Sequence, residues 1–165
     1  MLVYLLRHGI AEETADASVV DVDRPLSEDG VRQMKVQADA LRRIGAIFDE
    51  IWTSPHLRAR QTADILCVAQ QRGLAVHEVL ELAPDGDLDA VIDRLRRSGD
   101  DQNLALVGHE ISITKLAGLL LSGRTIPCIR FTCGAACCLE MQALDPILRA
   151  LLHWHLTPMQ LRGFM

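Results

Sequence analysis

The chain has 165 residues, 49% of them hydrophobic, and a formal net charge of −5. This size suits one hydrophobic core, so we expect a single domain over residues 1–165. The net acidity argues against non-specific binding of nucleic acid, which needs a basic face. The first apolar run, MLVYLL, is too short for a signal peptide or a membrane span, and we therefore expect a cytoplasmic protein without membrane contact.

Short apolar runs alternate with helical patterns, which is typical of an α/β sheet covered by helices on both faces. The run Leu2–Leu6 predicts a first strand, and a polar loop follows over 12–23. Ser27 has the chemistry of an N-cap, so a helix should begin there and end near Gly45. Its apolar face would carry Val31, Met34, Ala38 and Leu41.

The middle of the chain repeats this alternation. The run 50–53 predicts a second strand, and a long helix should continue to about Arg72, where Gly73 ends it. The run 75–80 predicts a third strand.

A turn at 84–87 separates this strand from the next helix. A fourth strand, the most hydrophobic, is expected over 103–107, and a further helix should open at Glu110. The inward residues of the helix after the turn would be Leu88, Val91, Ile92 and Leu95.

The last third of the chain changes character. The segment 123–134 has no regular pattern, whereas 135–142 and 147–154 indicate two strands joined around residues 145–146. The second of these also fits a short helix. The whole pattern predicts a three-layer α/β sandwich, with a mostly parallel central sheet and helices on both faces.

Charged and imidazole side chains follow each of the first four predicted strands. Arg7 and His8 come directly after the first, Arg58 shortly after the second, Glu81 after the third and His109 after the fourth. Ligands of an open parallel sheet bind beyond the carboxyl ends of its strands. We therefore expect these side chains to meet at one edge of the sheet.

This set of side chains predicts a phosphate site. Two guanidinium groups facing one spot repel each other unless an anion lies between them, and their paired donors match phosphate oxygens. Helix starts after Pro55 and Gly108 would add free backbone N–H groups. A neutral imidazole accepts a phosphoryl group, and nearby guanidinium groups should keep it deprotonated.

We expect no metal and no other cofactor. The same arginines would repel a cation. Four of the five cysteines cluster at 128–138 without the paired C-x-x-C spacing of a structural zinc site. An odd number of cysteines in a reducing compartment indicates free thiols that pack as small hydrophobic side chains.

The motifs, taken in order, resemble the histidine phosphatase (phosphoglycerate mutase-like) superfamily. Leu6-Arg7-His8-Gly9 near the N-terminus is followed by an S-x-x-x-R-A-x-x-T-A pattern within 53–63, and then by Gly108-His109. More narrowly, the short chain and the run 23–27 resemble the SixA branch of phosphohistidine phosphatases. Further likeness to this branch lies in Phe131, 134–136 and 154–158.

The resemblance implies a phosphoglycerate mutase-like fold and a role for each motif residue. His8 would be the nucleophile that forms a phosphohistidine, and Arg7, Arg58 and His109 would complete the phosphate pocket. Glu81 occupies the place where the superfamily often carries its general acid.

Other residues near the motifs have less defined roles. Asp85 and Asp87 lie close to Glu81 and could serve as the acid instead. Arg24 could reach the pocket rim and select acidic substrates, and Thr14 could help to hold phosphate. Asp23 is interpreted as the residue that orients Arg24 or its loop.

Two further positions bear on charge and specificity. Glu110 is interpreted as a favourable charge in the first turn of its helix. Many proteins of the SixA branch carry a lysine where Thr132-Cys133 stands in this chain, and this departure leaves the substrate open while the chemistry is retained.

The sequence predicts a phosphatase that removes the phosphoryl group from phosphohistidine in proteins. Its partner would be a phosphorylated protein such as a histidine phosphotransfer domain, because the chain has no long insertion that could form a lid over a small molecule. Two alternatives stay open. One is a phosphatase of small phosphomonoesters from the same superfamily, and the other is a non-catalytic relative that binds phosphorylated proteins.

Overall fold

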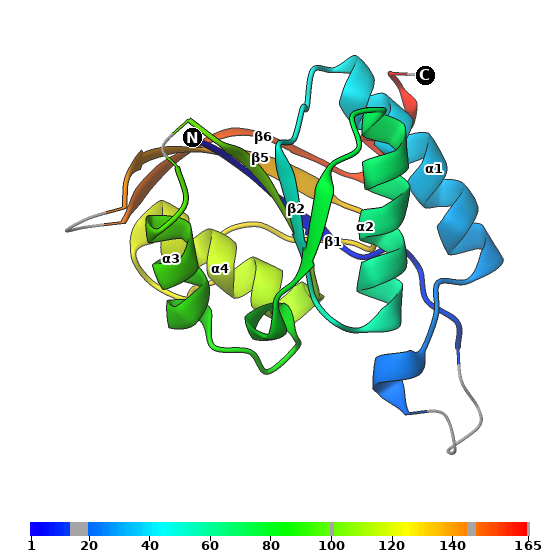
Figure 1. Cartoon of the computed structure of the whole chain (residues 1–165), viewed down its shortest axis with the longest axis horizontal. Coiled ribbons are helices and arrows are strands. Elements are labelled where there is room, and N and C mark those ends of the chain that lie inside the picture. The colour runs from blue at the N-terminus through cyan, green and yellow to red at the C-terminus, as the bar shows by residue number, and fades with distance from the viewer. Residues whose placement is uncertain (14–19, 100, 145–147, 165) are drawn as a thin grey trace.

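The computed structural model describes residues 1–13, 20–99, 101–144 and 148–164. Within them, six strands form one sheet in the order β3-β2-β4-β1-β5-β6 (Figure 1). The first four strands along the chain pair in parallel, and a C-terminal hairpin joins β1 through antiparallel pairing. The strands are β1 (Leu2–Arg7), β2 (Glu50–Thr53), β3 (Ala75–Glu78), β4 (Asn103–Gly108), β5 (Ala136–Ala143) and β6 (Arg149–Leu156).

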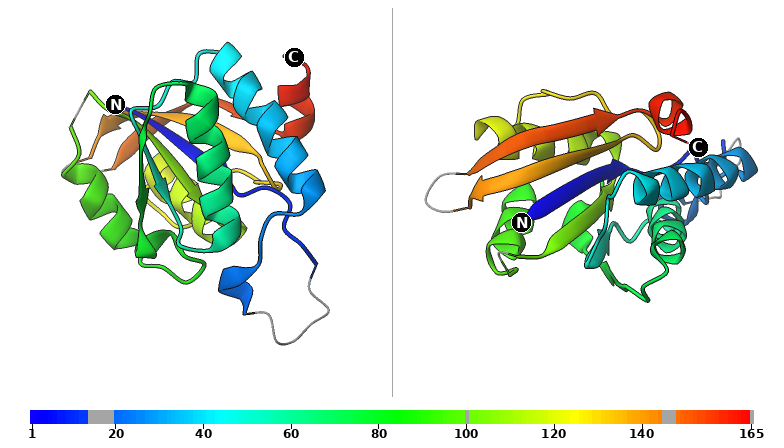
Figure 2. Two further views of the ribbon diagram at one scale, coloured as in Figure 1. Left: turned by 45° about the vertical axis from the view of Figure 1, so that its right-hand side comes forward. Right: turned by 90° about the horizontal axis from the view of Figure 1, so that it is seen from above.

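Helices cover both faces of this sheet (Figure 2). Two separate clusters of buried side chains lie on its two sides, one beneath α1 and α2 and the other beneath α3 and α4. The expected three-layer α/β sandwich is thereby confirmed. The α-helices are α1 (Glu28–Arg43), α2 (Leu57–Gln70), α3 (Leu88–Arg96), α4 (Glu110–Ser122) and α5 (Pro158–Arg162), and the short 3₁₀ helices are η1 (Asp21–Asp23) and η2 (Leu80–Leu82).

Strand β1 shows why the layers form. Successive side chains of a strand point to opposite faces of the sheet. Val3 and Leu5 therefore belong to the cluster beneath α3 and α4, whereas Tyr4 and Leu6 belong to the cluster beneath α1 and α2. All four are buried, so β1 lies in the centre of the sandwich and its carboxyl end is held on both sides.

The helix ends follow local chemistry at most of the predicted positions. The hydroxyl of Ser27 accepts a hydrogen bond from the Gly30 N–H at the start of α1, as predicted. At the end of α2, however, Gln71 already takes the left-handed conformation, with φ at 56°, two residues before Gly73, which is left-handed as well. The helix therefore stops earlier than predicted.

The third strand is also shorter than predicted. Strand β3 ends at Glu78, and the predicted last strand residue, Leu80, begins η2. A 3₁₀ helix has three residues per turn, so Val79 and Leu82 fall on the same side, and both are buried. Burial of Leu82 is the reason why the chain turns there.

The C-terminal segment confirms the second strand expected there and adds a helix. The last strand-like run forms β6, not the alternative short helix, while the turn predicted at 145–146 lies outside the described residues. Sequence analysis missed α5, which packs on α1 (Figure 2). Its signals were present, because Thr157 and Gln160 form a capping box and Pro158 is the first helical residue.

Candidate active site

The carboxyl ends of β1, β2 and β4 place three sequence-distant loops side by side. The N–H of His8 donates to the carbonyl of Gly108 at 3.0 Å, and the N–H of Ser54 donates to the carbonyl of Val107 at 2.9 Å. The strand pairing thus continues by one residue into the loops. As a result, His8, Arg58 and His109 gather at one edge, and each is more than nine-tenths buried.

The imidazole of His8 has one nitrogen held and one directed toward Arg58. Its Nδ1 lies 2.7 Å from the carbonyl oxygen of Gly9. Because a carbonyl only accepts hydrogen bonds, we assign the proton to Nδ1 and the lone pair to Nε2. The Nε of Arg58 donates to that Nε2 at 3.3 Å, which agrees with this assignment.

Burial lowers the pKa of His8 to about 4, and the charges of Arg58, Arg7 and Arg24 contribute in the same direction. The hydrogen bond to Gly9 opposes the shift without reversing it. His8 is therefore a neutral imidazole near pH 7. Its Nε2 carries the lone pair that a phosphoryl acceptor needs, and the role of His8 as nucleophile stays a prediction.

His109 is held by a neighbouring hydroxyl that sequence analysis did not single out. The Oγ of Ser54 lies 2.8 Å from Nε2 of His109, and Nη2 of Arg58 lies 3.4 Å from Nδ1. The ring stands edge-on to that of His8, with centroids 5.0 Å apart. Burial lowers the pKa of His109 to about 3, with further lowering by His8, Arg58 and His56.

Arg7 reaches the site from the end of β1 and also braces it. Its Nη1 lies 2.6 Å from a carboxylate oxygen of Glu110 and donates to the carbonyl of Phe131 at 2.8 Å. Glu110 thus serves as the partner of Arg7 as well as an acidic residue in the first turn of α4. The Nε of Arg7 is buried, and among the described residues no atom accepts its hydrogen bond. This donor is free for a ligand.

The second motif residue Thr62 ties the first loop to α2. Its hydroxyl accepts from the N–H of Gly9 at 3.1 Å and donates to the carbonyl of Arg58 at 2.7 Å. Gly9 is glycine for lack of space, because a Cβ there would lie 2.6 Å from Cγ of Met34. These contacts fix the distance between His8 and the start of α2.

Sequence analysis missed Asp21, the carboxylate that meets the buried arginine. Its Oδ2 lies 2.9 Å from Nη2 of Arg58 and 3.5 Å from Nδ1 of His56, and its Oδ1 lies 3.2 Å from Nη2 of Arg24. The carboxylate that pairs with Arg24 is thus Asp21, and not Asp23 as one of the two interpretations expected. The other interpretation, that Asp23 orients its loop, stays a prediction. One 3₁₀ turn places residues three apart on the same side, so Asp21 meets Arg24; that spacing was the available signal.

The remaining predicted site residues make no hydrogen bond or ion pair, in the described part of the chain, with the side chains of His8, Arg58 and His109. Glu81 lies in η2, beside the end of β4, and its carboxylate makes no hydrogen bond or ion pair with the described part of the chain. Asp85 is exposed, and Asp87 is the N-cap of α3. Arg24 is near enough to lower the pKa of His8. Thr14 lies outside the described residues.

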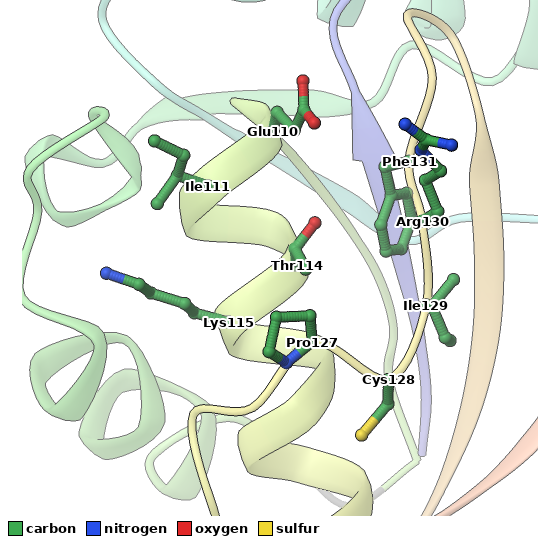
Figure 3. A pocket seen from close by; sticks show the side chains of 9 residues that line it. All are labelled: Glu110, Ile111, Thr114, Lys115, Pro127, Cys128, Ile129, Arg130 and Phe131. Atoms are coloured by element: carbon green, nitrogen blue, oxygen red, sulfur yellow. The ribbon is translucent and has the colours of Figure 1, made fainter.

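An open groove of about 510 Å³ begins next to this cluster. It runs between α4 and the segment 127–131, and two of its lining residues, Glu110 and Phe131, are the partners of Arg7 (Figure 3). Ile111 and Pro127 give it apolar surface, and the other lining residues are Thr114, Lys115, Cys128, Ile129 and Arg130.

Within the described ranges, no group of three or more histidine, cysteine, aspartate or glutamate residues could hold a metal ion. All five cysteines are free thiols. No helix in the described ranges combines the length and the apolar character needed to cross a bilayer.

Comparisons with known proteins place this geometry in context. The family described as "Histidine phosphatase superfamily (branch 1)" matches residues 3–83. An uncharacterized protein of Picosynechococcus sp. is 42% identical over 129 residues, which cover 76% of each chain. Phosphohistidine phosphatase SixA of Escherichia coli is 26% identical over 164 residues, covering 98% of this chain and 97% of SixA.

Solved structures with the same fold include enzymes with different named substrates. Protein histidine phosphatase SixA complexed with tungstate has a TM-score of 0.84 and 26% identity, and covers 98% of this chain and 99% of its own. The alpha-ribazole phosphatase of Shigella flexneri has a TM-score of 0.75 and 19% identity, with coverages of 96% and 97%. The phosphoglycerate mutase-like fold expected from the sequence is thereby confirmed.

Proposed function

The chain belongs to the histidine phosphatase superfamily, and from this premise we propose that it hydrolyses phosphohistidine in proteins through a phosphoryl intermediate on His8. The observation that carries the proposal is the buried, neutral imidazole whose Nδ1 is held by the carbonyl of Gly9 and whose Nε2 faces Arg58. The likeness to SixA over nearly the whole chain supports phosphohistidine as the substrate.

In the first step, Nε2 of His8 bonds to phosphorus while the bond between phosphorus and the substrate's imidazole nitrogen breaks. The leaving imidazole keeps the bond's electron pair and takes up a proton. The hydrogen bond from Nδ1 to the Gly9 carbonyl orients the ring and stabilises the positive charge that it gains. In the second step, a water oxygen bonds to phosphorus while the bond between phosphorus and Nε2 of His8 breaks; the electron pair of that bond returns to Nε2, so that inorganic phosphate and neutral His8 result.

The charges around His8 suit this transfer. Phosphoryl transfer depends mainly on positioning and on neutralising the equatorial oxygens. Arg58 lies against His8, the Nε of Arg7 lacks an acceptor in the described part of the chain, and His109 stands edge-on at 5.0 Å. An arriving phosphoryl dianion also favours the protonated form of His109, so this residue would stabilise the developing negative charge.

We assign the proton donor for the leaving group to Glu81. Asp87 is engaged as the cap of α3, whereas the Glu81 carboxylate is unengaged within the described ranges and lies in the η2 turn beside β4. An imidazole leaves more readily than an alkoxide, because the pKa of protonated imidazole, about 6.5, is far lower than the pKa of an alcohol. The donor therefore matters least for a phosphohistidine substrate.

The proposed substrate is a phosphorylated protein in the cytoplasm, of the histidine phosphotransfer type. The groove that continues from Arg7 offers surface beside the phosphate pocket for such a partner. A small phosphomonoester is the second candidate, since the same fold occurs in alpha-ribazole phosphatase. A non-catalytic binder is disfavoured, because binding alone would not need a neutral imidazole against Arg58.

The test compares three substrates with the purified protein: a histidine-phosphorylated phosphotransfer domain, an aryl phosphate and phosphoglycerate. We expect the phosphoprotein to be dephosphorylated with the highest kcat/KM. A preference for phosphoglycerate would overturn the protein substrate. A failure to turn over all three, with tight binding of the phosphoprotein, would overturn the enzymatic function itself.

A further inference from the structure

The buried arginine of the phosphate pocket already holds an anion that belongs to the chain. The side chain of Arg58 is 4% exposed, and that of Asp21, which meets it from η1, is 57% exposed. Arg24 and His56 approach the same carboxylate from two other directions. Asp21 therefore reaches inward from the surface and lies among the donors that a phosphate would use.

Two contacts link Asp21 to Arg58, and they have different natures. Its backbone carbonyl accepts from Nη1 at 2.7 Å, and its carboxylate accepts from Nη2 at 2.9 Å. The first contact does not depend on the side chain at position 21, so it braces the guanidinium in every variant. The second is an oxyanion contact of the kind that a phosphoryl oxygen makes, and a phosphoryl group has to replace it.

The carboxylate is ionised at neutral pH. Burial opposes its ionisation, but the hydrogen bond and charge of Arg58, with help from Arg24 and His56, lower the pKa of Asp21 below its usual value. In the described structure Arg58 thus has a charged partner of its own. The binding free energy that a bare phosphate gains at Arg58 is therefore only the difference between its own contacts with the guanidinium and the contacts that Asp21 loses.

We propose that Asp21 is a specificity-determining residue: its carboxylate occupies the phosphate position on Arg58, and every substrate must displace it. This proposal rests on the proposed function, and it explains why the site would prefer phosphoproteins to small phosphates. Displacement weakens the binding of small phosphates and of product phosphate. A large phosphoprotein offsets the same cost with contacts outside the pocket, for example along the groove that begins at Glu110 and Phe131.

The competing explanation is that the Asp21 carboxylate merely braces Arg58. The two explanations predict opposite changes. If the carboxylate competes with phosphate, its neutralisation should tighten phosphate binding. If it braces the guanidinium, its neutralisation should loosen phosphate binding and lower kcat.

The test compares Asp21→Asn with Asp23→Asn. Both residues belong to η1, both are exposed, and both substitutions remove one negative charge. Asp23 makes no side-chain hydrogen bond or ion pair with the described residues, which makes it a matched control for the general change in charge. Asp21→Ala is a second variant that removes the side-chain oxygens and keeps the backbone contact with Arg58.

The first readout is the Kd of inorganic phosphate, measured by calorimetry at fixed ionic strength, which requires no turnover. Exposed ion pairs contribute modestly, so we expect Asp21→Asn to bind phosphate about three- to tenfold more tightly and Asp23→Asn to bind it as the unmodified protein does. Unchanged or weaker binding in Asp21→Asn overturns the proposal. So does an equal gain in Asp23→Asn.

The second readout is the ratio of kcat/KM for the phosphoprotein to kcat/KM for an aryl phosphate. This ratio should fall about three- to tenfold in Asp21→Asn. Removal of the competing carboxylate should raise kcat/KM more for the aryl phosphate, which has no contacts outside the pocket, than for the phosphoprotein. An unchanged ratio overturns the role in specificity. Failure of the unmodified protein to act on the phosphoprotein would instead overturn the proposed function. The calorimetric comparison would still decide whether Asp21 competes with phosphate.

Discussion

The carbonyl oxygen of Gly9 lies 2.7 Å from Nδ1 of His8, so a contact between two adjacent residues sets which nitrogen of the imidazole is free. The N–H of the same glycine donates to the hydroxyl of Thr62, 53 positions away, which holds the loop against α2. The reactive geometry of His8 therefore depends on a local backbone turn that a long-range hydrogen bond keeps in place.

The first prediction concerns the intermediate. Rapid quenching during turnover of a ³²P-labelled substrate should trap a phosphoenzyme that is labile in acid and stable in alkali. His8→Ala should abolish the label and lower kcat by at least about 10³-fold, because the nucleophile is lost. His77→Ala is the control, since His77 is an exposed residue of β3. An undiminished rate in His8→Ala would refute the assignment of the nucleophile.

The second prediction concerns stability and pH. The pKa values of His8 and His109 are lowered to about 4 and about 3 in the folded protein, whereas unfolded histidine titrates at about 6.5. Below pH 6.5 the unfolded chain binds more protons than the folded one. The free energy of unfolding should therefore fall as the pH is lowered from about 6.5 toward 4, by up to about 1.4 kcal/mol per pH unit for each histidine.

Urea unfolding at pH 4.5–7.5 measures this dependence. His109→Gln should flatten it, because one of the two neutral imidazoles is removed. Equal slopes in the unmodified protein and in His109→Gln would contradict the lowered pKa of His109.

The third prediction concerns Ser54 as a positioning residue. Its Oγ lies 2.8 Å from Nε2 of His109 and orients that ring. Ser54→Ala should lower kcat about tenfold with little change in KM, because a misplaced charge stabiliser affects the transition state more than binding.

Ser98→Ala is the matched control for this substitution. The hydroxyl of Ser98 donates to the carbonyl of Arg94, in the turn after α3. Ser54→Thr, which retains the hydroxyl, should recover part of the lost rate. A loss of thermal stability in Ser54→Ala with kcat unchanged would mean that the hydroxyl is only structural.

The fourth prediction separates the candidate proton donors. Glu81→Gln should lower kcat strongly for an alkyl phosphate, about 10²-fold, and only slightly for phosphohistidine, whose leaving group needs less help. Asp85→Asn, at an exposed position of the same turn, should change neither rate. If Asp85→Asn shows the dependence on leaving group and Glu81→Gln does not, the donor is Asp85.

Asp87 completes this comparison through stability. Its carboxylate accepts hydrogen bonds from the N–H groups of Asp89 and Ala90 at the start of α3. Asp87→Ala should lower the free energy of unfolding by about 1 kcal/mol and leave kcat unchanged. A fall in kcat without loss of stability would instead make Asp87 the proton donor.

The arrangement of the pocket was largely predictable from sequence because it rests on local regularities. Alternation of apolar residues marks the strands, and parallel strands share one carboxyl edge. Residues that directly follow β1 and β4, such as His8 and His109, should therefore lie close together. In the structure the centroids of these two imidazole rings are 5.0 Å apart. Ser27 likewise starts α1 through a hydrogen bond that operates within one turn.

The exact ends of β3 and α2 were less predictable. Gln71 takes the left-handed conformation directly after α2, and Gly73 takes it as well two residues later, although glycine has the lower intrinsic cost there. Leu80 leaves the sheet because Leu82 is drawn into the core beside α3. At the end of β3, burial of Leu82 thus outweighs the local preference for a longer strand.

By itself the sequence determined the sandwich, the edge of the sheet at which the predicted site residues gather, and the pairing of imidazoles with guanidinium groups, since each follows from periodicity or from motifs in order. Only the tertiary structure decided that Asp21 meets Arg58, that Ser54 holds His109 and that Glu110 pairs with Arg7. These contacts depend on the path of loops and on side-chain rotamers across 37 to 103 positions of the chain, and no periodicity within one element encodes them.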